Sequence, residues 1–231
     1  MKRNQKEFKE NTYSQTHFFK DPKSLVSEQF RMLRTNIEFM AIDRSLQTLV
    51  ITSPTSGDGK TTVAANLAAA FASQRKKVLL VDTDLRKPQI HRFFGISNKS
   101  GLSTLFVELT RPVNTVVHPT SVPNLYVIPC GHIPPNPAEV LSSERMNQIM
   151  SQLKEQFDYI IYDTPPITVV ADAQIMAGKV DGTIFVLRKN SDKKTMIRKA
   201  KERADAANAH VLGAVFNREI VKMNDKSYYK A

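Results

Sequence analysis

The hydrophobic positions of this chain form short apolar runs, which are separated by longer segments with the periodicity of a helix. A nearly continuous apolar run such as 77–81 is typical of a strand buried on both faces, because helices cover both sides of a mostly parallel sheet. The pattern therefore predicts a single α/β domain in which a mostly parallel sheet lies between two layers of helices. The predicted strands are 49–51, 77–81, 125–128, 158–163, 183–187 and 211–216.

Helical periodicity marks several of the segments between these strands. Residues 23–41 are predicted to form the first helix, with Ser24 as its cap. The apolar stripe expected on this helix is Phe30, Leu33, Ile37 and Met40. A second helix carries Val63, Leu67, Ala70 and Phe71 at helical spacing, and two more are predicted at 138–157 and 193–207.

The stretch T-S-P-T-S-G-D-G-K-T-T, which follows the first predicted strand, has the chemistry of a phosphate-binding loop. Gly57 and Gly59 allow successive backbone N–H groups to turn toward phosphate oxygens. Lys60 supplies positive charge for the β- and γ-phosphates, and the Thr61 hydroxyl can bind Mg²⁺. Pro54 replaces the first glycine of the usual motif, and an ordinary glycine-rich turn is the alternative. The residues predicted to contact a nucleotide here are Ser56, Gly57, Asp58, Gly59, Lys60, Thr61 and Thr62.

Acidic residues end two of the predicted strands. Asp82 and Asp84 follow the second strand, and Asp163 closes the strand at 158–163. Ligands bind beyond the carboxyl ends of strands in an open parallel sheet, so the three carboxylates are expected at the same crevice as the phosphate loop. A strand that ends in an acid is typical of the carboxylate that organises Mg²⁺ in phosphate-loop enzymes. A turn of solvated charges is the alternative.

Length and composition are those of one soluble globular domain of 231 residues, 41% hydrophobic and 24% charged. No apolar run approaches the roughly 18 to 20 residues of a membrane span, and the N-terminus lacks the apolar core of a signal peptide, so we expect a cytoplasmic protein. The single cysteine, Cys130, excludes an intrachain disulfide and a multi-cysteine metal site. We interpret it as a buried apolar residue.

The ends of the chain differ from its middle. Residues 1–22 are polar and rich in lysine and are predicted to form a flexible basic arm, and residues 218–231 lack a core pattern, which leaves 23–217 as the folded domain. More than half of the net charge of +11 lies in the last fifth of the chain. Such a surface can meet nucleic acid, an anionic membrane or an acidic partner, and a solvated helix face explains it equally well.

Three motifs in chain order resemble those of the bacterial tyrosine kinases. G-K-T at 59–61 looks like Walker A, V-L-L-V-D-T-D-L-R-K-P at 78–88 like Walker A′, and Y-I-I-Y-D-T-P-P at 159–166 like Walker B. The stretches at 27–39 and 134–141 are also similar to that family. The resemblance is to the cytoplasmic kinase subunits of capsule and exopolysaccharide systems in Gram-positive bacteria, in which kinase and membrane adaptor are separate chains.

This resemblance implies a P-loop NTPase-type fold and phosphorylation of tyrosine with ATP and Mg²⁺. The implied catalytic residues are Lys60, Asp82, Asp84 and Asp163. Asp82 is expected to orient or deprotonate the tyrosine hydroxyl, and Asn217 to meet the adenine. The implied metal ligands are Thr61, Asp84 and Asp163.

The resemblance also implies partners. Tyr228 and Tyr229 are expected to accept phosphate, although relatives often carry more tyrosines there. A tail of about eleven residues from Asn217 to Tyr228 spans at most roughly 36 to 40 Å, which predicts transfer to a neighbouring subunit. Glu28, Arg31 and Arg34 form a charged ridge that the residues alone assign to solvent and the resemblance assigns to a homo-oligomeric ring. A membrane adaptor is expected to recruit and activate the protein, and no nucleic acid is expected.

Two other functions remain open at this point. One is a partitioning or septum-placement ATPase that switches on DNA or membrane, which shares the phosphate loop. The second lysine of that group would fall at Thr55, and its absence weighs against this function. The other is a non-catalytic ATP-binding regulator of polysaccharide export.

Overall fold

The computed structural model of the protein describes residues 17–40, 45–188 and 193–217. Both predicted acceptors, Tyr228 and Tyr229, lie outside these residues. The helices are α2 (His17–Lys20), α3 (Leu25–Met40), α4 (Lys60–Ala72), α5 (Ile90–Phe94), α6 (Thr104–Val107), α7 (Pro137–Ser142), α8 (Glu144–Lys154), α9 (Asp172–Ala177) and α10 (Lys194–Ala206), with a 3₁₀ helix η1 (Val113–Val116). The strands are β1 (Thr48–Thr52), β2 (Val78–Asp82), β3 (His118–Pro119), β4 (Leu125–Ile128), β5 (Tyr159–Asp163), β6 (Gly182–Arg188) and β7 (Val211–Asn217).

The strands form one sheet in the order β3-β4-β2-β5-β1-β6-β7. All pairings are parallel except that of the edge strand β3 with β4. Strand β5 lies between β1 and β2, so Asp163 is paired with Ile51 on one side and with Asp82 on the other. The predicted mostly parallel sheet is confirmed, and the carboxyl ends of β1, β2 and β5 lie next to one another.

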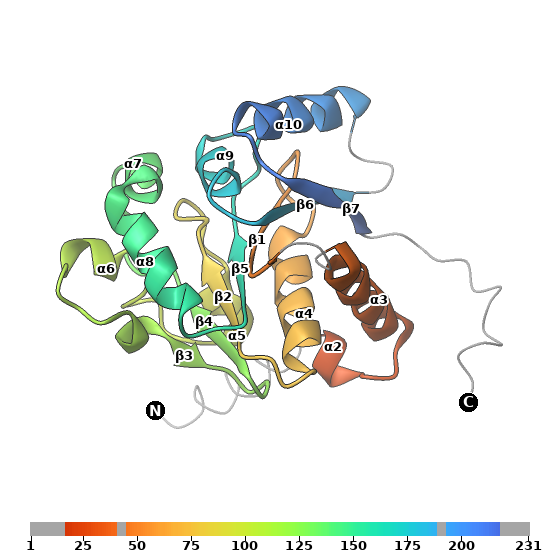
Figure 1. Cartoon of the computed structure of the whole chain (residues 1–231), viewed down its shortest axis with the longest axis horizontal. Helices are drawn as coiled ribbons and strands as arrows, with labels where there is room; N and C mark the ends of the chain where they lie inside the picture. Colours follow the sequence, from red (N-terminus) through yellow and green to blue (C-terminus); the bar gives the residue numbers. More distant parts are fainter. Residues whose placement is uncertain (1–16, 41–44, 189–192, 218–231) are drawn as a thin grey trace, which may run out of the picture.

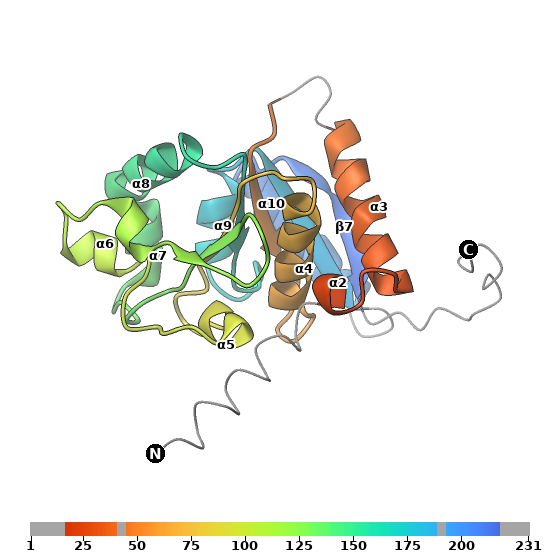
Figure 2. The same cartoon turned by 90° about the horizontal axis from the view of Figure 1, so that it is seen from below.

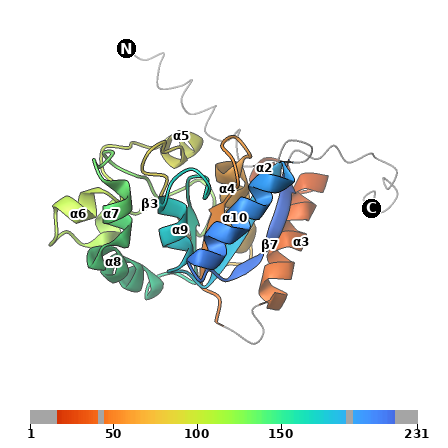
Figure 3. The ribbon, with the colours of Figure 1, turned by 90° about the horizontal axis from the view of Figure 1, so that it is seen from above.

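Alternate residues of each strand face different helix layers. In β6, Ile184 and Val186 belong to the core under α4, whereas Phe185 and Leu187 pack with Ala200 of α10. Figure 1 shows α3 and α4 on one side of β6 and β7 and α10 on the other. Figure 2 shows α2, α3 and α4 grouped together, and Figure 3 shows α8, α9 and α10 in a row. Because both faces are covered, the strands need no polar face.

The predicted helix at 138–157 is wrong as one unit. The structure divides it into α7 and α8 at Ser143, whose backbone is extended. The Ser143 side chain accepts a hydrogen bond from the N–H of Met146, which caps the start of α8. Helical periodicity continues across this break, so the capping residue Ser143 is its only signal in the sequence. The prediction also missed α9 and the two-residue strand β3.

Helix α3 begins as predicted, because the Ser24 hydroxyl accepts a hydrogen bond from the N–H of Ser27. Its buried side is shorter than expected: Ile37 is buried, but Met40 is 53% exposed. The Arg34 guanidinium donates to the carbonyl of Ala70 near the end of α4. Helix α3 is thereby fixed alongside the helix that follows the phosphate loop.

The predicted flexible arm at 1–22 is too long. His17–Lys20 form α2, and the Phe18 side chain is only 3% exposed in the core beneath α3 and α4. The Phe18 N–H donates to the Asn66 side chain at 3.0 Å, and the Arg31 guanidinium lies over its ring. A single buried aromatic residue in a polar segment has no periodicity, so the sequence pattern did not distinguish it from the arm.

Replacing Phe18 with Ala is expected to lower the free energy of unfolding by about 3 kcal/mol, because a buried aromatic side chain is lost from a packed site. Chemical denaturation of both proteins measures this difference. Phe39→Ala is the matched control, since Phe39 is 65% exposed on α3 and its loss should cost less than about 0.5 kcal/mol. Equal losses for the two variants would show that Phe18 does not anchor α2.

Candidate active site

The phosphate loop connects β1 to α4 and ends at Gly59, which has a φ of 93°. A side chain at this position would meet the Asn217 amide nitrogen at 2.0 Å from its Cβ, so both the backbone conformation and the close approach require glycine. The Asn217 amide also donates to the carbonyl of Asp58 at 2.7 Å. The end of β7 therefore holds the loop from one side.

Asp58 shapes the loop from within. Its carboxylate is buried and accepts hydrogen bonds from the N–H and the hydroxyl of Thr55. Closing the loop in this way occupies the side chain, so the contact of Asp58 with a nucleotide, which stays a prediction, would be made by its backbone. This bond also places a hydrogen-bonding residue at Thr55, where the switching ATPases carry their second lysine.

The first residues of α4 meet the end of β5. The Thr61 hydroxyl donates to an oxygen of Asp163 at 2.5 Å, although 102 residues separate the two in the chain. Lys60 is 9% exposed and close enough for its charge to lower the pKa of Asp163. The predicted grouping of lysine, hydroxyl and carboxylate is therefore present.

Asp82 lies behind this group. Its side chain is fully buried, and one carboxylate oxygen accepts the N–H groups of Gln89 and Ile90 at the start of α5. The backbone donors at the N-terminus of α5 draw this carboxylate inward. The expected contact of Asp82 with a tyrosine hydroxyl stays a prediction.

Asp84 is the acid that opens toward solvent. It is partly buried, and one of its carboxylate oxygens accepts the backbone N–H of Lys87 at 3.0 Å. It lies two residues beyond Asp82, after β2 has ended. The end of β2 thus holds one acid in the interior, and the loop after it presents another to the cleft described next.

A cleft of about 390 Å³ lies over the phosphate loop, and we call it the phosphate cleft. Residues of the phosphate loop and of the start of α4 line it, namely Ser56, Gly57, Gly59, Lys60, Thr61 and Thr62. The segment between β2 and α5 adds polar side chains, namely Asp84, Arg86, Lys87 and Gln89. The remaining wall is apolar and consists of Pro165, Pro166, Val169 and Val170. A charged group and an aromatic ring can thus occupy one cleft together.

The acids are arranged to receive a cation. Burial, with the neighbouring carboxylates of Asp163 and Asp84, raises the pKa of Asp82 well above its usual range. Burial raises the pKa of Asp163 to about 7, against the opposing effects of the Thr61 hydrogen bond and the Lys60 charge. One oxygen of Asp82 and one of Asp163 are buried with no hydrogen-bond partner in the described part of the chain. A nearby positive charge would stabilise the ionised form of buried carboxylates that lack a hydrogen-bond partner at one oxygen.

This arrangement fits Mg²⁺, which needs few protein ligands, better than a metal ion that is coordinated by protein side chains alone. Within residues 17–40, 45–188 and 193–217, no group of three or more His, Cys, Asp or Glu side chains can surround an ion. Mg²⁺ is usually held by one or two protein groups together with waters and substrate phosphates. Thr61 and Asp163 can supply those groups, and the free oxygen of Asp82 can accept a bond from a metal-bound water.

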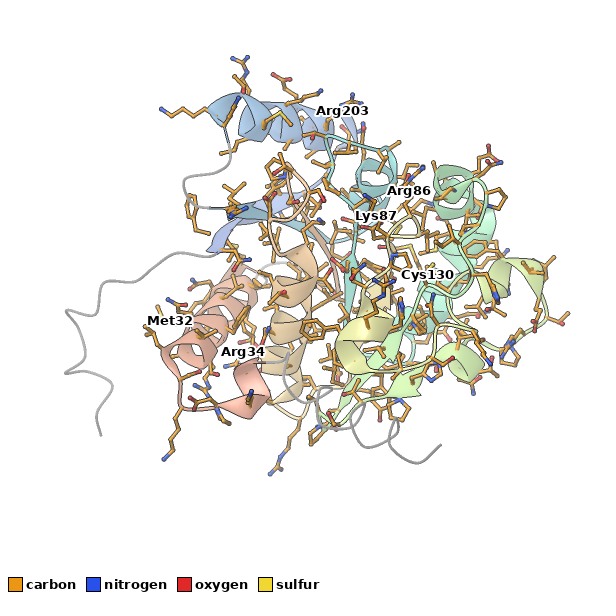
Figure 4. All side chains as sticks on the ribbon, turned by 180° about the vertical axis from the view of Figure 1, so that it is seen from behind. Met32, Arg34, Arg86, Lys87, Cys130 and Arg203 are labelled. Carbon is orange, nitrogen blue, oxygen red and sulfur yellow. The ribbon has the colours of Figure 1, made fainter. Side chains whose placement is uncertain are left out.

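Arg86 is a cleft residue that the site prediction missed. Its guanidinium makes two hydrogen bonds, at 2.9 and 3.1 Å, to the carboxylate of Asp172 in the first turn of α9. Asp172 is fully buried, whereas the Arg86 side chain is 43% exposed. Figure 4 shows Arg86 and Lys87 close together near the middle of the molecule. The motif D-T-D-L-R-K-P contains Arg86, but its partner lies 86 residues away.

A second pocket of about 440 Å³ adjoins the loop, and we call it the α3 pocket. Apolar and polar residues of α3, α4 and β7 line it together with the last residue of the phosphate loop, namely Val26, Gln29, Phe30, Leu33, Gly59, Thr62, Val63, Asn66, Val215, Phe216 and Asn217. Asn217 therefore reaches both the phosphate loop and an apolar pocket, as its predicted contact with adenine requires.

Comparison with known proteins agrees with this geometry. Residues 46–188 match the family model described as AAA domain. The chain is 43% identical over 210 residues to tyrosine-protein kinase YwqD of Bacillus subtilis (strain 168), covering 90% of this chain and 88% of that protein. This chain belongs to the bacterial tyrosine-protein kinases.

Other relatives of the kinase cover nearly the whole chain. It is 38% identical over 221 residues to the putative tyrosine-protein kinase CapB of Staphylococcus aureus, with 96% of both chains covered. The crystal structure of the chimerical protein CapA2B2 superposes with a TM-score of 0.85 at 38% identity, covering 89% of this chain and 90% of that one. The septum site-determining protein MinD of Pyrococcus horikoshii, at 23% identity and a TM-score of 0.63, shares the fold. The family relationship favours the kinase over the switching ATPase.

The charged ridge of the kinase has partners within its own chain. Arg31 pairs with Glu28 at 2.8 Å and donates to the carbonyl of Pro22. Arg34 contacts Ala70 and lies 3.7 Å from Glu38. The ridge is therefore not simply solvated, and its part in a ring stays a prediction.

Two further expectations for the kinase concern its environment. Cys130 is fully buried, as predicted, and burial raises the pKa of its thiol to about 12. Within the described part of the chain, none of the helices has the length and apolar character to cross a bilayer.

Proposed function

We propose that this kinase transfers the γ-phosphoryl group of Mg²⁺-bound ATP to tyrosine hydroxyls. The hydrogen bond between Thr61 and Asp163, beside Lys60 in the phosphate cleft, is the observation that carries the proposal. This arrangement is what a phosphate-loop enzyme needs to hold a magnesium triphosphate. The bond from the tyrosine oxygen to γ-phosphorus forms as the bond from γ-phosphorus to the β-bridging oxygen breaks. ADP leaves with the bridging oxygen, and the phenol proton passes to Asp82, the expected base.

The side chains of the cleft have separate parts in this proposal. Lys60 neutralises the β- and γ-phosphates, and Thr61, Asp84 and Asp163 hold Mg²⁺ directly or through waters. Asp82 is proposed to orient or deprotonate the tyrosine hydroxyl, as the resemblance implies. A loose phosphoryl-transfer transition state depends on positioning and charge more than on a strong base. The apolar wall of the cleft gives the phenol ring a surface to lie against.

The α3 pocket is proposed to hold the adenine. Its apolar side chains suit a flat base, and the Asn217 amide next to Gly59 lies where the pocket meets the phosphate loop. Nucleotide pockets combine apolar walls with a few placed polar groups in this way. Helix α3 then contributes to ATP binding as well as to the predicted oligomer contact through Glu28, Arg31 and Arg34.

The wider function is proposed from the relatives. The kinase would phosphorylate Tyr228 and Tyr229 of its own tail and protein substrates, and would regulate capsule or exopolysaccharide synthesis. The similar structure is that of a chimerical protein, CapA2B2, which supports a partner chain. A membrane adaptor with a cytoplasmic tail would recruit the kinase to the inner face of the membrane and activate it.

Transfer between subunits is the testable core of this proposal. A Lys60→Met chain lacks activity but keeps its acceptors, and a Tyr228→Phe/Tyr229→Phe chain lacks acceptors but keeps its cleft. Mixing the two with ATP and Mg²⁺ is expected to give phosphotyrosine on the Lys60→Met chain, because a neighbour's tail reaches the active cleft. Tags of different length on the two chains allow a phosphotyrosine blot to distinguish them by size.

Each variant alone serves as the control and should give no tail signal. If wild-type protein labels its tail while the mixture stays unlabelled, transfer occurs only within one chain. If wild-type protein with an adaptor tail forms no phosphotyrosine at all, the proposed kinase reaction is wrong for this chain.

A further inference from the structure

We infer that Arg86 contacts the γ-phosphoryl group of the bound triphosphate and so distinguishes ATP from ADP. The inference rests on the proposed function, because it places the nucleotide phosphates in the phosphate cleft. Arg86 lines this cleft together with Lys60 and Thr61. The cleft therefore receives cationic groups from two separate segments, Lys60 at the end of the phosphate loop and Arg86 in the loop after β2.

The ion pair with Asp172 fixes where the Arg86 guanidinium lies. Asp172 accepts bonds from both Nε and Nη2 of Arg86, and its carboxylate is fully buried in the first turn of α9. A guanidinium has five N–H donors, so the bonds to Asp172 leave Nη1 and part of Nη2 available. A side chain held by one edge in this way is preorganised to bind an anion with the other.

The exposure of the pair is uneven. A purely structural ion pair has no need to leave 43% of the arginine exposed in a cleft while its carboxylate is completely buried. The hydrogen bond with Asp172 also raises the pKa of Arg86, so the group stays charged at all working pH values. The exposed part of Arg86 belongs to a residue that lines the phosphate cleft.

The position of Arg86 predicts which phosphate it contacts. The proposed function places the phosphates nearest to α4 in the phosphate loop, and Arg86 lines the same cleft from a different loop, together with Asp84 and Lys87. The acceptor must approach from the open side of the γ-phosphoryl group, along the apolar wall. Arg86 therefore neutralises charge on the group that is transferred, as an arginine supplied in cis does in other phosphate-loop enzymes.

The test compares affinities for ADP and for the β,γ-imido analogue of ATP, with Mg²⁺, measured by titration calorimetry. Arg86→Ala is expected to lose about tenfold in affinity for the analogue and to keep its affinity for ADP, because one charge-assisted hydrogen bond is lost. Arg86→Lys should keep part of the preference. Asp172→Asn, which releases the guanidinium, should lose most of it.

Arg198→Ala is the matched control, since Arg198 is also an ion-paired arginine but lies exposed on α10 with Glu202. It should change neither affinity. Equal losses for ADP and the analogue in Arg86→Ala would make the role structural and overturn the inference, as would no loss at all. If Arg86→Ala does not fold, the same comparison in Arg86→Lys decides, and an unchanged preference there overturns the inference.

The result separates this inference from the proposed reaction. Analogue preference is a binding measurement and needs no tyrosine acceptor. A wild-type protein that prefers the analogue but forms no phosphotyrosine would contradict the kinase reaction and leave the assignment of Arg86 intact. A wild-type protein that forms phosphotyrosine, paired with an Arg86→Ala variant of unchanged preference, would contradict only the assignment.

Discussion

Replacing Lys60 with Met is expected to lower the initial rate of phosphotyrosine formation by about two to three orders of magnitude. Lys60 is only 9% exposed and lines the phosphate cleft. A cation held in such a site stabilises charge that develops on the phosphates, and water cannot replace it. The methionine side chain fills nearly the same space without the charge, so the phosphate loop should keep its shape.

The rate is measured by quantitative blotting of phosphotyrosine at saturating ATP with an adaptor tail present. Lys201→Met is the control, because Lys201 pairs with Asp205 on the exposed face of α10. That variant should keep the wild-type rate. A Lys60→Met protein that retains near-normal activity would remove the phosphate loop from the mechanism and would contradict the proposed site.

Replacing Asp163 with Asn is expected to stabilise the metal-free protein at pH 8 while abolishing its response to Mg²⁺. Burial raises the pKa of Asp163 to about 7 from an ordinary value of 3.8. Between these two values the unfolded carboxylate has lost its proton while the folded one still holds it. The contribution of Asp163 to stability therefore falls as pH rises from about 4 to about 7, and stays low above that.

The asparagine carries no charge, so it avoids this loss and can still accept the hydrogen bond from Thr61. The variant should be more stable than wild type by about 2 to 4 kcal/mol at pH 8, and the difference should vanish near pH 4. Denaturant unfolding in the presence of a chelator, at both pH values, measures it. Asp205→Asn, an exposed acid on α10, should show no such difference.

Mg²⁺ adds a second measurement to this prediction. Wild-type protein should gain stability when Mg²⁺ is added at pH 8, because the ion binds only the folded state, whereas Asp163→Asn should gain none. A variant that is less stable than wild type at pH 8 would mean that the acid cluster does not destabilise the fold. Active sites that hold like charges close together commonly lower the free energy of unfolding in this way.

Several features of the kinase could be predicted because they are local. The phosphate loop requires glycine, lysine and threonine within a few residues, and the apolar strand before it and the helical segment after it indicate where it lies. The acids at 82, 84 and 163 each lie at or just after the end of a strand. The rule that ligands bind beyond the carboxyl ends of parallel strands was therefore enough to place them near the loop. The failures came where one residue decided the outcome, as at Ser143 between α7 and α8 and at Phe18 in α2.

The sequence by itself determined the sheet, the phosphate loop and the acids at the strand ends, because each depends on neighbours along the chain. Only the tertiary structure decided which carboxylate faces the cleft. The backbone donors at the start of α5 draw Asp82 inward and leave Asp84 in the cleft. The partners of the cleft residues are equally remote: Asp163 lies 102 residues from Thr61, and Asp172 lies 86 residues from Arg86. Such pairings carry no local pattern, since they arise when β5 inserts between β1 and β2 and brings α9 to the cleft.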